Sequence, residues 1–142
     1  MPRLPLPRWS GNYHHIPYVV HGRDESGVDC WGLVRLVYLE QFNIELPCLA
    51  DRYEHTRFED AKTLASVVND VKQEWFEIPY AQREVGDVIV MRYAGEPMHV
   101  GIVVSEDTML HARCNRGVGL TVYDSLENRN RIAGFYRHAL NR

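Results

Sequence analysis

Residues 29–41 read Asp29-Cys30-Trp31-Gly32-Leu33-Val34-Arg35-Leu36-Val37-Tyr38-Leu39-Glu40-Gln41 and carry a clear helical pattern in a chain of 142 residues. The i, i+3, i+4, i+7 spacing that predicts an α-helix is followed by Cys30, Leu33, Val34, Val37 and Gln41. Leu36 and Leu39 widen the apolar face, so we expect a helix that is buried on most sides. Asp29 stands where an N-cap residue belongs.

A second helix and then a series of strands are expected further along the chain. Thr56-Arg57-Phe58-Glu59 fits a capping box, and an apolar stripe runs from there to Trp75. After Pro79 the period changes to that of strands, which we place at 87–93, 99–104, 108–113, 119–123 and 132–137. Helices followed by strands predict an α+β fold, with N-terminal helices packed on an antiparallel sheet of about five strands.

Length and composition fit one domain, which we place at residues 9–142. Three prolines within the first seven residues resist regular structure, so we expect residues 1–8 to form an extended arm. A net charge of −3 gives no electrostatic footprint for nucleic acid and no polybasic membrane anchor. The first residues also lack the apolar core of a secretion signal, so we expect another agent to carry the protein wherever it acts outside the cytoplasm.

Cys30 is the candidate for a nucleophile. At the first turn of a helix, the macrodipole and unpaired backbone N–H groups favour an anion. We therefore expect a lowered pKa for this thiol and a greater reactivity than that of Cys48 and Cys114, which lie in no motif. Gly32 is a poor helix former, which indicates that something approaches the start of the helix closely. The alternative for Cys30 taken alone is a small buried residue.

A nucleophilic cysteine needs a base, and two histidines stand out by their positions in the expected strands. If Ser105-Glu106-Asp107 forms a three-residue hairpin loop, Gly101 faces His111. Because side chains alternate along a strand, His99 and His111 then lie on one face as diagonal neighbours. A two-residue loop would put them on opposite faces. Cys30 with both histidines suits a catalytic triad, and a zinc site built from the same residues is the stereochemical alternative.

Four blocks of sequence extend this pattern. One runs from Tyr18-Val19-Val20-His21-Gly22 to Asp29-Cys30-Trp31-Gly32-Leu33-Val34, and the later ones are Val85-Gly86-Asp87-Val88-Ile89-Val90, His99-Val100-Gly101-Ile102-Val103 and Leu110-His111-Ala112. In type and order they resemble the NlpC/P60 family of cysteine peptidases, over roughly residues 9–137. The fuller run of residues 22–35, with Ile44-Glu45-Leu46-Pro47 after the helix, is similar to the branch found in phage tail proteins.

The resemblance implies a papain-like fold and a Cys-His-His triad. In that triad Cys30 is the nucleophile, His99 the general base and acid, and His111 the group that orients His99. The family order favours this triad over the zinc alternative, and we expect no metal and no cofactor.

Three more residues occupy positions that the family places beside the site. Tyr18 would donate a hydrogen bond to the developing oxyanion, together with the backbone N–H of Cys30. Asp29 would either cap the helix or bind an amine of the substrate. Trp31 stands where many bacterial members have a small serine, and its ring would pack on the sheet or narrow the substrate cleft.

The activity implied by the resemblance is cleavage of peptide bonds in the stem peptides of bacterial peptidoglycan, at a phage tail tip that penetrates the cell wall. The expected partners are the stem peptide and other tail-tip proteins, without nucleic acid or membrane. The protein would be made in the host cytoplasm, travel in the virion tail and act in the periplasm or cell wall.

Two alternatives stay open. One is a structural tail-tip or assembly protein that retains the papain-like fold, and the other is a papain-like amidase or acyltransferase. Some of the latter are circularly permuted, with histidine before cysteine. Cys30 precedes both histidines here, which favours the peptidase.

Overall fold

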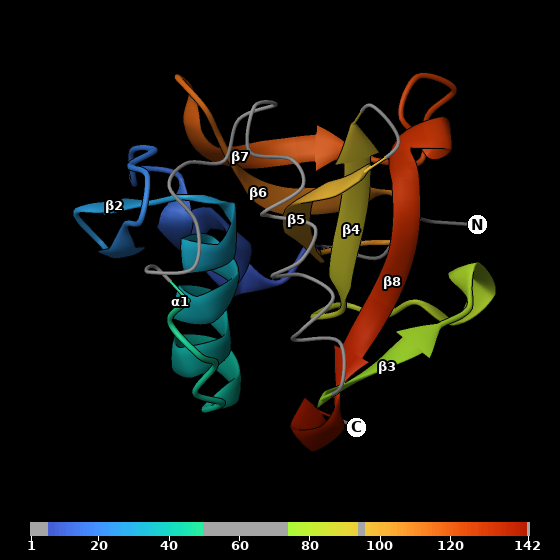
Figure 1. Cartoon of the computed structure of the whole chain (residues 1–142), viewed down its shortest axis with the longest axis horizontal. Coiled ribbons are helices and arrows are strands. Elements are labelled where there is room, and N and C mark those ends of the chain that lie inside the picture. The colour runs from blue at the N-terminus through green and yellow to red at the C-terminus, as the bar shows by residue number, and fades with distance from the viewer. Residues whose placement is uncertain (1–5, 50–73, 94–95, 142) are drawn as a thin grey trace.

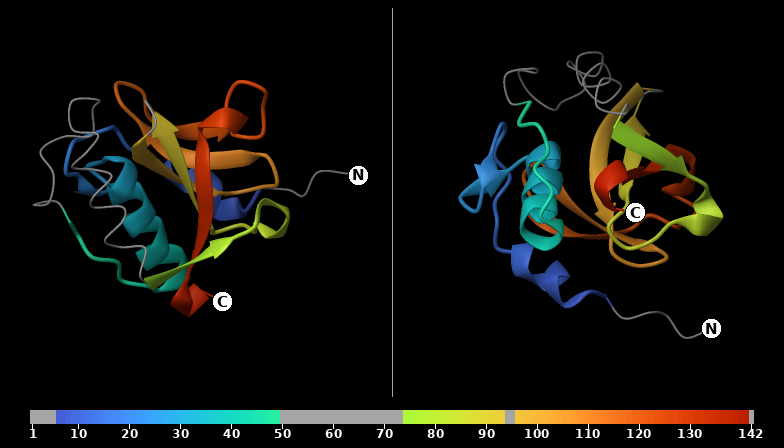
Figure 2. Two further views of the ribbon diagram at one scale, coloured as in Figure 1. Left: turned by 45° about the vertical axis from the view of Figure 1, so that its right-hand side comes forward. Right: turned by 90° about the horizontal axis from the view of Figure 1, so that it is seen from below.

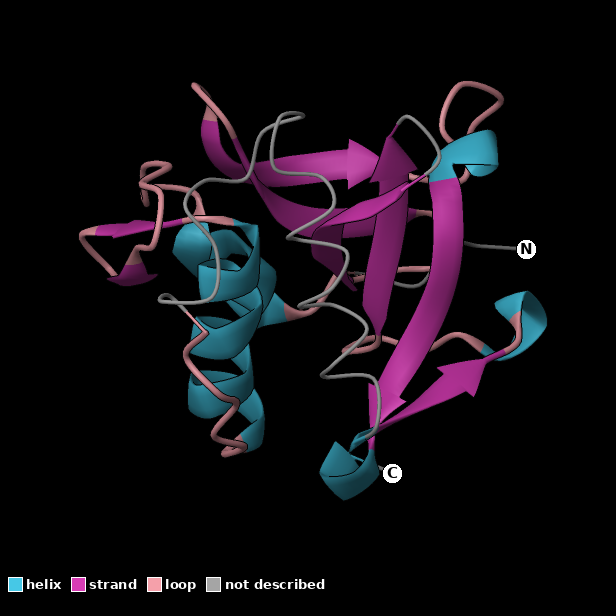
Figure 3. Ribbon diagram, in the orientation of Figure 1, coloured by secondary structure: helices cyan, strands magenta, loops and turns pink. Residues whose placement is uncertain are grey.

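The computed structural model describes residues 6–49, 74–93 and 96–141, in which one α-helix packs against a twisted antiparallel sheet (Figure 1). The elements are η1 (Arg8–Tyr13), β1 (Arg23–Asp24), β2 (Gly27–Val28), α1 (Cys30–Phe42), β3 (Trp75–Ile78), η4 (Tyr80–Gln82), β4 (Val88–Tyr93), β5 (Glu96–Val103), β6 (Thr108–Arg113), β7 (Gly117–Val122), η5 (Arg129–Arg131), β8 (Ile132–His138) and η6 (Ala139–Asn141). The predicted α+β class is confirmed (Figure 3).

The main sheet has six strands in the order β3-β8-β4-β5-β6-β7, and β1 pairs with β2 in a separate hairpin. The five predicted strands are all present, and β6 has the predicted bounds. The additional strand is β3, where Trp75 pairs with His138 and contacts the rings of His138 and Tyr38. The assignment of Trp75 to a helix was therefore wrong, because pairing with β8 outweighs the local pattern. The rest of the predicted second helix lies outside the described residues.

Helix α1 begins after Asp29, where the sequence predicts, and ends at Phe42. Asp29 is its N-cap and accepts a hydrogen bond from the backbone N–H of Gly32 at 2.8 Å. Asn43 ends the helix in the left-handed conformation, with its N–H bonded to the carbonyl of Tyr38. Most of the apolar residues of α1 are buried, although Leu39 is 42% exposed. Figure 2 shows the helix lying along one side of the sheet.

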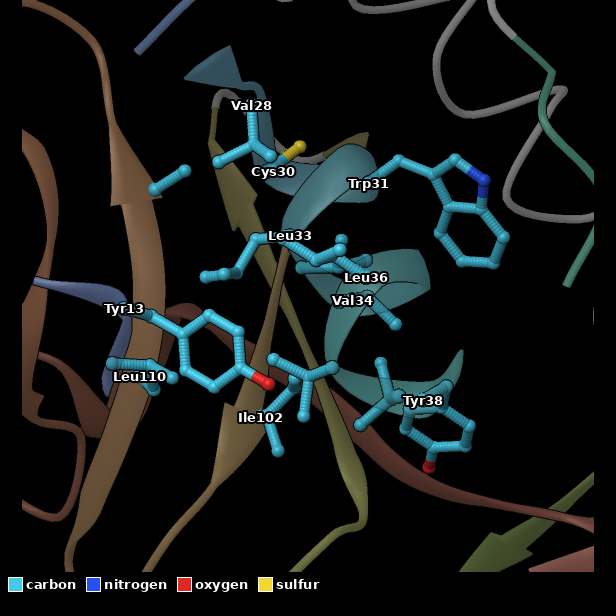
Figure 4. Close-up of a cluster of buried hydrophobic side chains, with 14 of the residues drawn as sticks. Tyr13, Val28, Cys30, Trp31, Leu33, Val34, Leu36, Tyr38, Ile102 and Leu110 are labelled. Carbon is cyan, nitrogen blue, oxygen red and sulfur yellow. The ribbon is translucent and has the colours of Figure 1, made fainter. Parts of the chain in front are cut away.

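The core is divided between the two faces of the sheet, because successive side chains of a strand point to opposite sides. Val88 and Val90 of β4 belong to the cluster that includes the apolar residues of α1. Ile89 and Met91 belong to a second cluster. In Figure 4, Leu33 of α1 extends toward the strands that carry Ile102 and Leu110. This packing fixes the N-terminal end of α1 relative to β5 and β6.

The N-terminal segment joins the domain earlier than predicted. Arg8, which we placed in the extended arm, begins η1, and Trp9 packs edge-on against the rings of Tyr13 and Phe42. Residues 1–5 of the arm lie outside the described residues. Within the described ranges, no helix combines the length and the apolar character that crossing a membrane requires.

Asp87 and Arg137 form a largely buried ion pair that joins the start of β4 to β8. Nε of Arg137 donates to Oδ1 of Asp87 at 2.7 Å, and Nη2 donates to Oδ2 at 2.8 Å. Oδ2 also accepts from the backbone N–H of Glu84 at 2.7 Å, and the Asp87 side chain is 1% exposed. Asp87 therefore satisfies a guanidinium and a backbone donor at once.

We expect Asp87→Ala to lower the free energy of unfolding by about 2–3 kcal/mol, because the Arg137 guanidinium loses its buried partner. Urea unfolding followed by tryptophan fluorescence measures this change. The matched control is Arg129→Ala, which breaks the exposed ion pair with Asp124 and should leave the midpoint nearly unchanged. Equal shifts in the two variants would contradict the assignment of stability to the buried pair.

Candidate functional site

The predicted hairpin loop brings His99 and His111 together. Residues 104–107 connect β5 to β6, and the N–H of Val104 bonds to the carbonyl of Thr108, so that residues 105–107 form the tip of the hairpin. Ile102 pairs with Leu110, and the same register continued by one residue places Gly101 opposite His111. A Cβ on Gly101 would lie 3.2 Å from the Cβ of His111, so glycine leaves room at this point. Nε2 of His99 lies 2.8 Å from Nδ1 of His111, and the ring centroids are 5.0 Å apart. The prediction that the two rings share one face is confirmed.

Cys30 is the first residue of α1, and its sulfur lies beside the middle of β5. The backbone N–H groups of Val100 and Trp31 donate to this sulfur, and the residue is only 2% exposed. Val100 follows His99 directly in the sequence, and α1 packs against both β5 and β6. The structure therefore places the sulfur of Cys30 next to Val100, the residue that follows His99 in β5, and His111 lies on the neighbouring strand β6.

Burial determines the protonation state of the Cys30 thiol. Burial and the carboxylate of Asp29 raise the pKa of this thiol to about 12, and the backbone N–H groups and Arg23 oppose the rise. The expected lowering of the pKa at the helix start is therefore wrong. Desolvation and a neighbouring anion outweigh the helix dipole here, so the resting thiol is neutral.

The two imidazoles are also neutral near pH 7. Burial lowers the pKa of His99 to about 4. Burial, followed by the charges of His99 and Arg113, lowers the pKa of His111 to about 3. A neutral thiol and neutral imidazoles are suited to a reaction in which the proton moves during the attack. They differ from a thiolate and imidazolium pair, which would already exist before the substrate binds.

A residue that the sequence analysis did not single out completes this arrangement. Oγ1 of Thr121 on β7 lies 2.7 Å from Nε2 of His111. A threonine in a strand is common, so the sequence carries no signal for this contact, which depends on the pairing of β7 with β6. Both ring nitrogens of His111 are engaged by protein groups, which argues against the zinc alternative. Among the described residues, no group of three or more His, Cys, Asp or Glu is arranged to hold a metal ion.

Asp29 holds the loop in front of Cys30 as well as the helix. Its Oδ1 accepts from the backbone N–H of Gly32 and from Nη1 of Arg23, both at 2.8 Å. Its Oδ2 accepts from the backbone N–H of His21 at 2.9 Å. Of the two roles expected for Asp29, the structure shows the cap, with the carboxylate fully buried.

Gly32 is required by the chain's own backbone. The loop before α1 approaches so closely that a Cβ on Gly32 would collide with the carbonyl oxygen of Gly22. The close approach that the sequence predicted at the helix start is thus made by residue 22. The contact packs the loop directly against the turn that carries Cys30.

The Trp31 ring packs against the segment that follows α1. The carbonyl oxygens of residues 46–48 accept hydrogen bonds from Arg35, Trp31 and Arg23, in that order, at 3.0, 2.9 and 3.0 Å. The indole is 6% exposed, and Figure 4 shows it pointing away from Leu33 and the sheet. Of the two orientations expected for Trp31, packing on the sheet is therefore wrong.

Tyr18 lies in the segment that pairs with the backbone just before Cys30. It forms a parallel bridge with Val28, with hydrogen bonds of 3.0 Å on either side. The half-buried Tyr18 also lines an open pocket of about 450 Å³, whose wall consists of residues 14–18, Val20 and residues 114–117. The backbone of Tyr18 is thus paired with Val28, two residues before the candidate nucleophile, and the pocket that Tyr18 lines is formed by residues other than Cys30, His99 and His111.

Known proteins resemble this chain in sequence and fold. The model of the NlpC/P60 family matches residues 15–137. A probable endopeptidase of Haemophilus influenzae is 33% identical over 126 residues, which cover 84% of this chain and 60% of the relative. The Escherichia coli K12 protein murein DD-endopeptidase MepS/murein LD-carboxypeptidase is 26% identical over 110 residues, or 78% of this chain and 47% of the relative. The chain therefore spans about half the length of these curated relatives.

Solved structures share the fold. The NlpC/p60 domain of the peptidoglycan hydrolase SagA has a TM-score of 0.58 at 22% identity, covering 89% of this chain and 90% of that domain. An NlpC/P60 family protein from Bacillus cereus has a TM-score of 0.66 at 19% identity, covering 94% of this chain and 41% of the other.

We expect iodoacetamide at neutral pH to label Cys48 and Cys114 before Cys30, because the first two are exposed and the third is a buried neutral thiol. Peptide mapping by mass spectrometry after short exposures measures the order. The same reaction in guanidinium chloride, where all three should react alike, is the control. Preferential labelling of Cys30 in the folded protein would contradict the assignment of a neutral buried thiol.

We expect Gly32→Ala to destabilise the domain, because its methyl group would displace the carbonyl of Gly22 and disturb the Asp29 contacts. The matched control is Gly11→Ala, since no atom lies within 4 Å of a Cβ at that position. Thermal unfolding measures both variants. A melting temperature for Gly32→Ala equal to that of Gly11→Ala would show that the loop is not packed against the helix start.

Proposed function

Because the chain belongs to the NlpC/P60 family, we propose that it is a cysteine peptidase that hydrolyses peptide bonds in the stem peptides of peptidoglycan. The names of its relatives, a murein endopeptidase and a peptidoglycan hydrolase, support this substrate class. The observation that carries the proposal is the hydrogen bond between His99 and His111 next to the strand position that contacts the sulfur of Cys30.

The proposed reaction begins with proton transfer from the thiol. Nε2 of His99 is engaged by His111, and we assign to Nδ1 of His99 the role of taking the proton from Cys30. The sulfur then forms a bond to the carbonyl carbon of the scissile peptide. Since thiol and imidazole are both neutral at rest, the proton moves as the sulfur attacks, when the developing charge passes to the carbonyl oxygen.

The tetrahedral oxyanion needs donors, which we assign to the hydroxyl of Tyr18 and the backbone N–H of Cys30. When the C–N bond breaks, His99 gives its proton to the leaving amine, and a thioester forms on Cys30. Water then adds to the thioester carbonyl, with His99 taking the proton of the water. As the C–S bond breaks, His99 returns this proton to the sulfur of Cys30, and the free carboxyl product leaves. We assign Trp31 no part in these steps, because its ring N–H donates to the carbonyl of Pro47.

Delivery by a phage tail is the finer part of the proposal. It is supported by the similarity of residues 22–35 and 44–47 to the phage tail branch. Side chains of the first run donate to carbonyls at the end of the second, so the two stretches act as one structural unit. In this proposal the protein is made in the host cytoplasm, travels in the virion tail beside other tail-tip proteins, and acts in the periplasm or cell wall.

The function is tested by digesting purified peptidoglycan and identifying the released muropeptides by mass spectrometry, with Cys30→Ala as the inactive control. Cleavage within stem peptides by the wild type alone supports the peptidase. Transfer of the acyl group to an added amine would show an acyltransferase. No reaction from a folded wild-type protein would favour the structural role. Detection of the protein in purified tail particles by immunoblot tests the delivery.

We expect His99→Ala to abolish turnover and His111→Ala to retain a measurable part of the peptidase activity. A base takes part directly in proton transfer, an effect of about 10²–10⁴-fold, whereas an orienting group acts through geometry. Initial rates of stem-peptide hydrolysis, normalised to the folded fraction from circular dichroism, measure both variants. A greater loss in His111→Ala would reverse the two assigned roles.

A further inference from the structure

The hydroxyl of Thr121 stands at the end of a continuous chain of hydrogen bonds. Its Oγ1 lies 2.7 Å from Nε2 of His111, and Nδ1 of His111 lies 2.8 Å from Nε2 of His99. Each imidazole is therefore bonded through the nitrogen that faces its neighbour. The position of the proton on one ring thus fixes the position of the proton on the next.

The register of the strands makes Thr121 a specific neighbour of His111. His111 pairs with Gly119, so Thr121, two residues further along β7, lies diagonally across on the same face. Gly119 has no side chain, and the guanidinium of Arg113 lies where its Cβ would stand. That cation opposes protonation of His111 and favours a neutral ring with a single N–H.

We propose that Thr121 is a positioning residue, which accepts a hydrogen bond from Nε2–H of His111 and thereby selects the tautomer of both histidines. The inference rests on the peptidase function proposed above. To take the thiol proton, His99 must have a bare Nδ1, and its own proton is then on Nε2. Nε2–H of His99 donates to Nδ1 of His111, so the proton of His111 must be on Nε2, where Thr121 accepts it.

The opposite direction of these hydrogen bonds would prevent His99 from acting as the base. If Thr121 donated to Nε2 of His111, the proton of His111 would lie on Nδ1 and point at His99. His99 would then carry its proton on Nδ1, the nitrogen that has to receive the thiol proton. The two directions of the hydrogen bonds differ only in which ring nitrogens carry protons. Determining the tautomers of both histidines therefore distinguishes them.

The test compares Thr121→Val, which removes the hydroxyl at nearly constant shape, with Thr121→Ser, which keeps it. Thr108→Val is the control, because it removes the hydroxyl of a different threonine, which is buried at the first position of β6 and bonded to Asp107. We expect Thr121→Val to lower kcat by about 10- to 100-fold with KM nearly unchanged, and Thr121→Ser and Thr108→Val to keep kcat within a few-fold of wild type.

The second readout is independent of activity. Long-range ¹H–¹⁵N spectra of histidine-labelled protein at pH 7 report which ring nitrogen carries the proton. We expect Nε2–H tautomers for both histidines in the wild type and in Thr121→Ser, and loss of this pattern in Thr121→Val. An Nδ1–H tautomer of His111 in the wild type would overturn the inference, as would an unchanged pattern in Thr121→Val. These spectra decide the matter even if the wild type cleaves no stem peptide, a result that would count against the proposed function alone.

Discussion

The buried carboxylate of Asp29 is the constraint on which the candidate site depends. A charge without solvent contact is stable only where donors surround it, and here the donors come from the helix start, the preceding loop and Arg23. Because one side chain satisfies all of them, the loop and the first turn of α1 cannot move independently. Cys30, the next residue in the chain, is therefore held in a fixed position.

The same carboxylate has an electrostatic consequence. It adds to burial in keeping the neighbouring thiol protonated, against the helix dipole and the backbone N–H groups that favour the thiolate. The two histidines are kept neutral by burial as well. Rigidity and burial thus produce a candidate site with little charge at rest, in which hydrogen bonds link Thr121, His111 and His99.

Hydrogen bonds also link the start of α1 to the segment that follows the helix. Side chains at and before the start of α1 hold the segment after it through the carbonyls of residues 46–48. Trp31 contributes to this contact, although its position next to the candidate nucleophile Cys30 suggests a role toward substrate. Neighbouring side chains on a helix point about 100° apart. A residue that follows a candidate nucleophile in the sequence therefore need not point toward the same side of the helix.

Periodicity, turn residues and the capping aspartate determined much of the protein from the sequence alone. They predicted α1 with its cap and five strands between residues 87 and 137, because these features depend on local spacing. They also showed that a three-residue loop would put His99 and His111 on one face, which the structure confirms. Only the tertiary structure decided the rest. The place of Trp75 in β3, the neutral state of Cys30 and the contact of Thr121 with His111 depend on burial and on pairing between distant segments, for which local sequence carries no signal.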